Sequence, residues 1–183
     1  MVAMQKVFTF AQNFTIMESV ILVDEKDRAI GTMEKMEAHQ KGVMHRAFSI
    51  FVFNDEGELM LQQRALTKYH SPGQWTNTCC SHPREGEITS EAAHRRLVEE
   101  MGFDTALEEK FSFTYYSDEV GEGLIEHEFD HVFFGNYQQE PQLNPEEVNA
   151  WKFMSMKDIQ KDMKGIFKSL LQNKITKTKA VNT

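Results

Sequence analysis

One stretch, Trp75–Gly102, constrains the fold of this chain more than any other part of its sequence. It reads WTNTCCSHPREGEITSEAAHRRLVEEMG and divides into a loop, a glycine-bearing turn and an amphipathic helix. Thr89 can cap the helix, and Gly102 stands just past its last turn. An apolar stripe at helical spacing predicts the face that the helix buries, and it consists of Ala93, Leu97 and Met101.

Runs of β-branched and aromatic residues on both sides of this stretch predict a sheet. Strands are expected at Glu18–Asp24, His45–Asn54, Glu58–Arg64, Phe111–Tyr116, Leu124–Phe134 and Val148–Phe153, and the second and third of these form a hairpin. Two further helices are expected, a short one at Thr32–Gln40 and a C-terminal one that starts at a Ser155/Asp158 capping box and ends near Gln172. The pattern predicts an α/β (α+β) fold, with a mixed sheet flanked by helices.

Chain length and composition favour a single domain. The 183 residues, 40% of them hydrophobic, suffice for one core and are too few for two. The first strand pattern follows Met17 directly, so residues 1–17 are expected to be an extension that is disordered or not native. The domain is expected over residues 18–172, followed by a polar tail over 173–183.

The distribution of charge and of apolar residues excludes two classes of partner. The net charge is −8, and no sustained Lys/Arg run precedes the last few residues, which argues against a nucleic-acid surface. A small anionic ligand remains possible, because it needs only a few well-placed cations and a metal. No run of about 18 apolar residues is present, so no membrane span is expected.

Cys79 and Cys80 are the only two cysteines of the chain. Adjacent cysteines are poorly placed to bridge each other, and neither has another partner. We therefore expect no disulfide and a protein of the reducing cytoplasm, while the oligomeric state stays open.

Side chains of metal-ligand type lie on elements that can converge in the fold. They are His39, His45, His82, Glu126 and Glu128. Imidazoles and carboxylates without thiolates suit a divalent ion such as Zn²⁺ or Mn²⁺. Each residue alone has an ordinary alternative, since a lone histidine is more often a hydrogen-bonded core or surface residue. The strand face with the two glutamates can equally be a solvated one.

Two further groups can carry chemistry. The acidic residues of the loop and helix, Glu87, Glu99 and Glu100, can hold Mg²⁺ against phosphates, or they can form an ordinary charged helix face with Arg95 and Arg96. Cys80 stands two residues before a histidine in a loop that precedes a helix. It is either a functionally tuned thiol or a small buried hydrophobe.

Several segments together carry a family resemblance. They are GTMEKMEAH (31–39), HRAFS (45–49), LMLQQRALTK (59–68), SPGQW (71–75), TNTCCSHP (76–83), RRLVEEMG (95–102) and IEHEFDHVF (125–133). The chain resembles the type I isopentenyl-diphosphate isomerases, the metal-dependent isomerases of the Nudix superfamily, from about Glu18 to Phe153. The resemblance implies a Nudix-like fold and a small isoprenoid diphosphate as the substrate.

Carried over by position, the resemblance also implies roles for individual residues. It makes the five residues of metal-ligand type, His39, His45, His82, Glu126 and Glu128, ligands of a tightly held Mn²⁺ or Zn²⁺ ion. Glu100 would bind Mg²⁺ at the diphosphate, whose oxygens Lys35, Arg64 and Lys68 would neutralise. Cys80, Glu128 and Tyr115 would be catalytic, with Tyr115 near the glutamate.

The sequence departs from the patterns of the superfamily and of the isomerases at three places. In the Nudix loop and helix, Ser81 stands at the first glycine and Arg96 replaces a glutamate, while Glu87 and Arg95 are retained. A basic residue at this place counts against diphosphate hydrolysis. The isomerases usually have a tryptophan in the C-terminal segment, and Ile166 or Phe167 lies near that place here.

These inferences predict an enzyme that interconverts isopentenyl and dimethylallyl diphosphate. The reaction adds a proton to an alkene carbon and removes another from an allylic carbon, so it needs an acid and a base on different elements. Two alternatives remain. They are a Nudix pyrophosphohydrolase and a non-catalytic module that binds isoprenoid diphosphates.

Overall fold

The computed structural model describes residues 18–68, 71–118 and 123–162. The described strands are β1 (Ser19–Val23), β2 (Ala29–Glu34), β3 (His45–Phe53), β4 (Leu59–Arg64), β5 (Trp75–Thr76), β6 (Cys79–Ser81), β7 (Leu107–Ser117), β8 (Glu126–Asn136) and β9 (Val148–Met154). The helices are α1 (Lys35–Lys41), α2 (Thr89–Met101) and α3 (Met156–Asp162). None of these helices is long and apolar enough to span a membrane.

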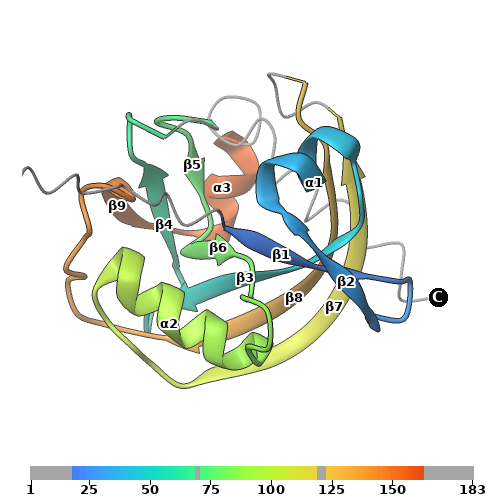
Figure 1. Ribbon diagram of the computed structural model, residues 1–183. Coiled ribbons are helices and arrows are strands. Elements are labelled where there is room, and N and C mark those ends of the chain that lie inside the picture. The colour runs from blue at the N-terminus through green and yellow to red at the C-terminus, as the bar shows by residue number, and fades with distance from the viewer. Residues whose placement is uncertain (1–17, 69–70, 119–122, 163–183) are drawn as a thin grey trace, which may run out of the picture.

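Strand β3 is the centre of a curled mixed sheet. It pairs in parallel with β8, from His45 opposite Glu128 to Phe53 opposite Asn136, and antiparallel with β1, β4 and β6. The long strand β7 continues the sheet beyond β8 in antiparallel register. Figure 1 shows the two long strands curving beside β3, with α2 on one side of β3 and α1 on the other. The predicted α/β (α+β) fold with a mixed sheet is confirmed.

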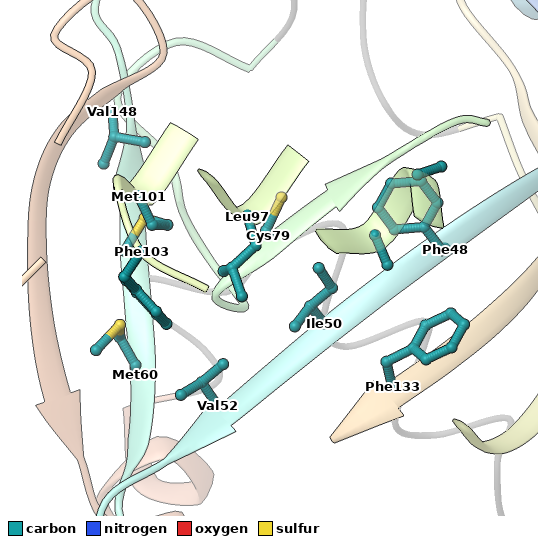
Figure 2. Close-up of a cluster of buried hydrophobic side chains, with 12 residues drawn as sticks. Phe48, Ile50, Val52, Met60, Cys79, Leu97, Met101, Phe103, Phe133 and Val148 are labelled. Atoms are coloured by element: carbon teal, nitrogen blue, oxygen red, sulfur yellow. The ribbon is translucent and has the colours of Figure 1, made fainter. Parts of the chain in front are cut away.

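The main hydrophobic core lies between β3 and α2. Alternate residues of a strand point to opposite faces of a sheet, and Phe48, Ile50 and Val52 are fully buried on the face toward α2. They pack with Leu97 and Met101, two residues of the predicted helical stripe (Figure 2). The other face of β3 therefore carries His45, Ala47 and Ser49, away from this core.

The strand next to β1 was not predicted. Residues 29–34 form β2 and pair antiparallel with β1, and the helix expected at Thr32–Gln40 begins only at Lys35. The turn between β1 and β2 is stabilised by Asp24, whose carboxylate accepts hydrogen bonds from the backbone amides of Lys26 and Arg28. Pairing with β1 thus outweighs the helix propensity of the segment.

The predicted caps are partly correct. Gly102 is left-handed after α2, and the Ser155 hydroxyl accepts the Asp158 amide as expected of a capping box. The assignment of Thr89 as the helix cap is wrong, because the Ile88 carbonyl already accepts the Ala92 amide and Thr89 lies in the first turn. The C-terminal helix is described to Asp162, and the part expected beyond it, with Ile166 and Phe167, lies outside the described residues.

Gly102 provides a test of how α2 joins the following loop. Its φ is 71°, and a Cβ added to it would lie 2.1 Å from the carbonyl oxygen of Gln142. Left-handed strain of about 1 to 2 kcal/mol adds to this clash, so Gly102→Ala should lower the free energy of unfolding by more than about 3 kcal/mol. Urea denaturation measures the loss.

Gly57→Ala is the matched control. Gly57 has a φ of 74°, but a Cβ there would meet nothing within 4 Å. Only the left-handed strain applies, so the expected loss is about 1 to 2 kcal/mol. Equal losses for the two variants would show that Gln142 moves away freely.

Candidate active site and metal centre

Three histidines and one glutamate converge from four places in the fold. His39 lies on α1, His45 begins β3, His82 follows β6, and Glu128 lies opposite His45 on β8. One ligand atom from each of the four lies within 4.8 Å of all the others. All four residues are buried, so the interpretation of these histidines as isolated surface groups is excluded.

Backbone contacts hold α1 against β8. The Ile125 amide donates to the His39 carbonyl at 2.8 Å, and the His127 ring nitrogen Nδ1 donates to the Gly42 carbonyl at 3.0 Å. These two bonds fix the C-terminal end of the short helix beside the first residues of the strand. His39 and Glu128 are brought together in this way, although 88 positions separate them in the sequence.

Two of the rings are oriented by backbone carbonyls. His39 Nδ1 donates to the Lys35 carbonyl at 2.7 Å, and His45 Nδ1 donates to the Val43 carbonyl at 2.8 Å. A proton on Nδ1 leaves the Nε2 lone pair of a neutral ring available. Within the described residues, the buried His45 Nε2 atom has no hydrogen-bond partner. An imidazole nitrogen of this kind is suited to a metal ion.

Burial keeps two of the rings neutral. It lowers the pKa of His45, and it lowers the pKa of His82 to about 3, against the opposing attraction of Glu128 in both cases. His82 Nε2 lies 3.2 Å and His45 Nε2 lies 3.8 Å from the same Glu128 oxygen, Oε1. Neutral imidazoles beside a carboxylate fit a divalent cation of the Zn²⁺ or Mn²⁺ type.

Glu126 and Tyr115 lie next to this cluster. The Tyr115 hydroxyl is 2.9 Å from a Glu126 oxygen and 2.5 Å from a Glu128 oxygen. Burial raises the pKa of Tyr115 well above its usual value, and the two carboxylates raise it further. Glu126 is only 5% exposed, so the solvated interpretation of this strand face is wrong. Glu126 is not, however, among the four residues whose ligand atoms lie within 4.8 Å of one another.

A pocket of about 70 Å³ opens beside these residues. Its lining contains most of the predicted site residues, namely His39, His82, Glu126, Glu128, Tyr115, Cys80, Lys35 and Arg64. The strand β6, which carries Cys80, and the strand β8, which carries Glu128, flank β3 on opposite sides. The thiol and the carboxylate therefore reach one pocket from two different elements.

The two cysteines point to opposite faces of the sheet. Cys80 pairs with Ser49 and lines the pocket, whereas Cys79 pairs with Ile50 and packs into the core beside Leu97 (Figure 2). Burial raises the pKa of the Cys79 thiol well above its usual value. Both cysteines are free, in agreement with the prediction that they form no disulfide with each other.

The predicted anion-binding and Mg²⁺ residues divide into two groups. Lys35 and Arg64 line the pocket, and Lys35 forms a 2.8 Å ion pair with Glu18. Lys68 and Glu100 are not part of the pocket lining. Lys68 pairs with Glu147, and Glu100 accepts hydrogen bonds from Gln62, at 2.9 Å, and from Arg96.

Arg96 occupies the middle of the acidic group on α2. Its guanidinium contacts Glu100, lies 2.8 Å from Glu99 and lies 3.4 Å from Glu147. Burial opposes the charge of Arg96, but the carboxylates, Glu100 first, outweigh burial and raise its pKa. The contacts of Gln62, Glu147 and Glu18 with these residues were not predicted from the sequence, because the three come from distant segments and no local pattern marks them.

Comparisons with known proteins assign the fold. The family model of the NUDIX domain matches residues 43–173. A crystal structure from Deinococcus radiodurans superposes with a TM-score of 0.67 at 19% identity and covers 81% of this chain and 91% of that one. A MutT protein from Methanosarcina mazei superposes with a TM-score of 0.55 at 18% identity, covering 64% and 81% of the two chains. The curled sheet, with α2 and its preceding loop, thus forms a Nudix domain.

Comparison of this sequence with those of named proteins narrows the family assignment. "Isopentenyl-diphosphate Delta-isomerase 2" of Aromatoleum aromaticum is 55% identical over 147 residues, which span 80% of this chain and 77% of that protein. "Isopentenyl-diphosphate Delta-isomerase" of Serratia proteamaculans is 55% identical over 142 residues, which span 78% and 79%. The chain belongs to the isopentenyl-diphosphate Delta-isomerases of the Nudix superfamily, as the resemblance in its sequence predicted.

The cluster predicts binding of one Mn²⁺ or Zn²⁺ ion. The ion should stabilise the folded protein by about 2.7 kcal/mol at a free concentration 100-fold above its dissociation constant. His39→Gln should weaken this binding at least about tenfold, since it removes one imidazole of the cluster. Isothermal titration calorimetry and the metal-dependent shift in Tm provide the measurements.

His94→Gln is the control for this experiment. His94 lies on α2 and pairs with Asp104 at the surface, at 2.6 Å. Its replacement should leave the metal affinity unchanged. If the two variants bind the ion equally well, the four-residue cluster is not the metal site.

Proposed function

We propose that this chain catalyses the interconversion of isopentenyl diphosphate and dimethylallyl diphosphate. The observation that best supports the proposal is the common pocket of Cys80 and Glu128, in a chain that belongs to the isomerase family. The reaction adds a proton at one carbon and removes one at another, so it needs two groups of opposite function. A thiol and a carboxylate from strands on either side of β3 meet this need.

Glu128 is the proposed partner of Cys80 in these proton transfers. Its side chain is held by the Tyr115 hydroxyl at 2.5 Å and by His82 at 3.2 Å, so its orientation in the pocket is set from two sides. Tyr115 serves in this proposal to hold Glu128 and Glu126 side by side. The substrate itself would have to close this small, partly open pocket to keep water away from the carbocation that the protonated alkene would form.

We propose that Mn²⁺ or Zn²⁺ is held by His39, His45, His82, Glu128 and, at the edge of the cluster, Glu126. When bound, such an ion supplies positive charge that fixes the carboxylates and lowers their proton affinity. The neutral rings and the Nδ1–H bonds of His39 and His45 support this assignment. The cytoplasm is the proposed location, since a reducing compartment preserves the free Cys80 thiol.

Anchoring of the diphosphate is the proposed task of Lys35 and Arg64, which line the pocket. Lys68 would join them by exchanging its partner Glu147 for a phosphate oxygen. Glu100 would bind Mg²⁺ at the diphosphate, which requires its contact with Arg96 to open. Binding energy at the diphosphate would orient the short hydrocarbon arm between Cys80 and Glu128.

Diphosphate hydrolysis is the alternative that Arg96 disfavours. The guanidinium of Arg96 lies among Glu99, Glu100 and Glu147, where its charge competes with a metal ion. A protein that releases phosphate or pyrophosphate from isopentenyl diphosphate would nevertheless be a hydrolase. Substrate binding without turnover would instead identify a non-catalytic isoprenoid-diphosphate-binding module.

Substitution of the proposed acid and base provides the main test. Cys80→Ala and Glu128→Gln should each lower the isomerisation rate by at least about 10²-fold, because each removes one of the two proton-transfer groups. The assay incubates metal-loaded protein with isopentenyl diphosphate in deuterated water and follows product and label by NMR. Circular dichroism confirms that the variants are folded.

Cys79→Ala is the control within the same strand. Cys79 is fully buried on the core face of β6, so its replacement should affect stability more than the chemistry. An unchanged isomerisation rate for Cys80→Ala would remove the proposed role of that thiol. A rate loss for Cys79→Ala as large as that for Cys80→Ala would point to a structural cause for both.

A further inference from the structure

Lys35, which lines the pocket, has a carboxylate partner beside it at the open end of the β1–β2 hairpin. Its ammonium group lies 2.8 Å from Glu18 Oε2, and its backbone amide donates to the Glu18 carbonyl, also at 2.8 Å. The β1–β2 register, with Ser19 opposite Glu34, places Glu18 beside Lys35. Glu18 does not itself line the pocket, but its carboxylate holds Lys35, which does, and it carries the same sign of charge as the diphosphate.

The two members of this ion pair differ in exposure. The Lys35 side chain is 21% exposed and the Glu18 side chain is 47% exposed. A cation that is mostly removed from water needs an anion beside it, whereas a half-exposed carboxylate can return to water at little cost. Lys35 is thus the fixed member of the pair, and Glu18 is the member that can be replaced.

The cations around Glu18 keep its carboxylate ionised. Burial alone would raise the pKa of Glu18, but the charge of Lys35 and its hydrogen bond outweigh burial, and the pKa falls to about 2. Glu18 is therefore negatively charged at neutral pH. An incoming anion must compete with this carboxylate for Lys35.

We propose that Glu18 is a resident counter-anion of the diphosphate site, which holds Lys35 until a diphosphate oxygen replaces it and thereby limits the affinity for anionic substrate. This role of Glu18 depends on one part of the proposed function, namely that Lys35 binds the diphosphate. A diphosphate can replace the carboxylate because it offers more charge and more acceptor oxygens. Part of its binding energy is then used to break the ion pair.

The test measures binding of inorganic pyrophosphate, with Mg²⁺, to the full-length protein by isothermal titration calorimetry. Glu18→Gln removes the competing charge, so pyrophosphate should bind about two- to fivefold more tightly, the range expected for loss of a partly exposed ion pair. The KM for isopentenyl diphosphate should fall by a similar factor while kcat stays the same. An unchanged or weaker affinity for pyrophosphate would overturn the proposal, because Glu18 would then merely orient Lys35.

Glu37→Gln is the matched control. Glu37 also has a 47% exposed side chain and pairs at 2.5 Å with Lys41, which lies on the same helix but does not line the pocket. This variant removes the same net charge, so its pyrophosphate affinity should stay at the wild-type value. If Glu37→Gln raised the pyrophosphate affinity as much as Glu18→Gln, the change in net charge alone would explain both gains, and the proposal would be overturned.

Lys35→Met completes a double-mutant cycle. In that background Glu18→Gln should no longer change pyrophosphate affinity, because no cation remains to be released. If Lys35→Met alone leaves the affinity unchanged, or if the wild type binds no pyrophosphate, the counter-anion proposal fails, whatever the isomerase assay shows. If pyrophosphate binds as expected but no isomerisation occurs, the proposed reaction fails and the role of Glu18 stands.

Discussion

The parallel pairing of β3 with β8 is the interaction on which the candidate site depends. It sets His45 directly opposite Glu128 and continues for nine residue pairs to Phe53 and Asn136. A shift of one residue would turn Glu126 and Glu128 to the opposite face of the sheet, where Phe129 and His131 now lie. Because the pairing is long, and because Phe48, Ile50 and Val52 must face α2, this register is strongly determined.

The two faces of β3 serve different purposes. Phe48, Ile50 and Val52 on the face toward α2 are apolar, and their burial stabilises the domain. The other face begins with His45 and meets the buried carboxylates of β8, which are costly to remove from water. Neutral imidazoles, the Tyr115 hydroxyl and a bound cation would reduce that cost. The site is therefore held in place by a core that lies on the opposite side of the same strand.

Much of the fold could be predicted from local patterns. The apolar run along 45–54, the alternation along 124–134 and the stripe of Leu97 and Met101 depend on residues close in sequence. The two-residue β5 and the three-residue β6 were not predicted, because each is stabilised mainly by pairing with a strand further back in the chain. β2 was not predicted because its residues favour a helix, although it pairs with the neighbouring strand β1. Burial of Glu126 and Glu128 also depends on α1 docking against β8, which no short pattern shows.

The candidate ligands could be recognised only as a set. A single histidine such as His39 has too many ordinary roles, and it was the combination with His45, His82 and the two glutamates that raised the probability of a metal site. Two ion-pair partners from other segments of the chain could not be predicted. Glu18 reaches Lys35 through the register of the hairpin, and Glu147 reaches Arg96 from the loop before β9. These contacts require the assembled sheet.

Arg96 explains how one fold can carry a different site. In the Nudix pattern a glutamate stands at this place among other acids, and here a guanidinium lies between Glu99, Glu100 and Glu147. The guanidinium supplies positive charge that offsets the repulsion between these carboxylates on and beside the helix. The imidazole cluster then stands on the other face of β3. The fold is retained, while most residues of the cluster lie outside the loop and helix that define the superfamily, with His82 as the member that the loop itself supplies.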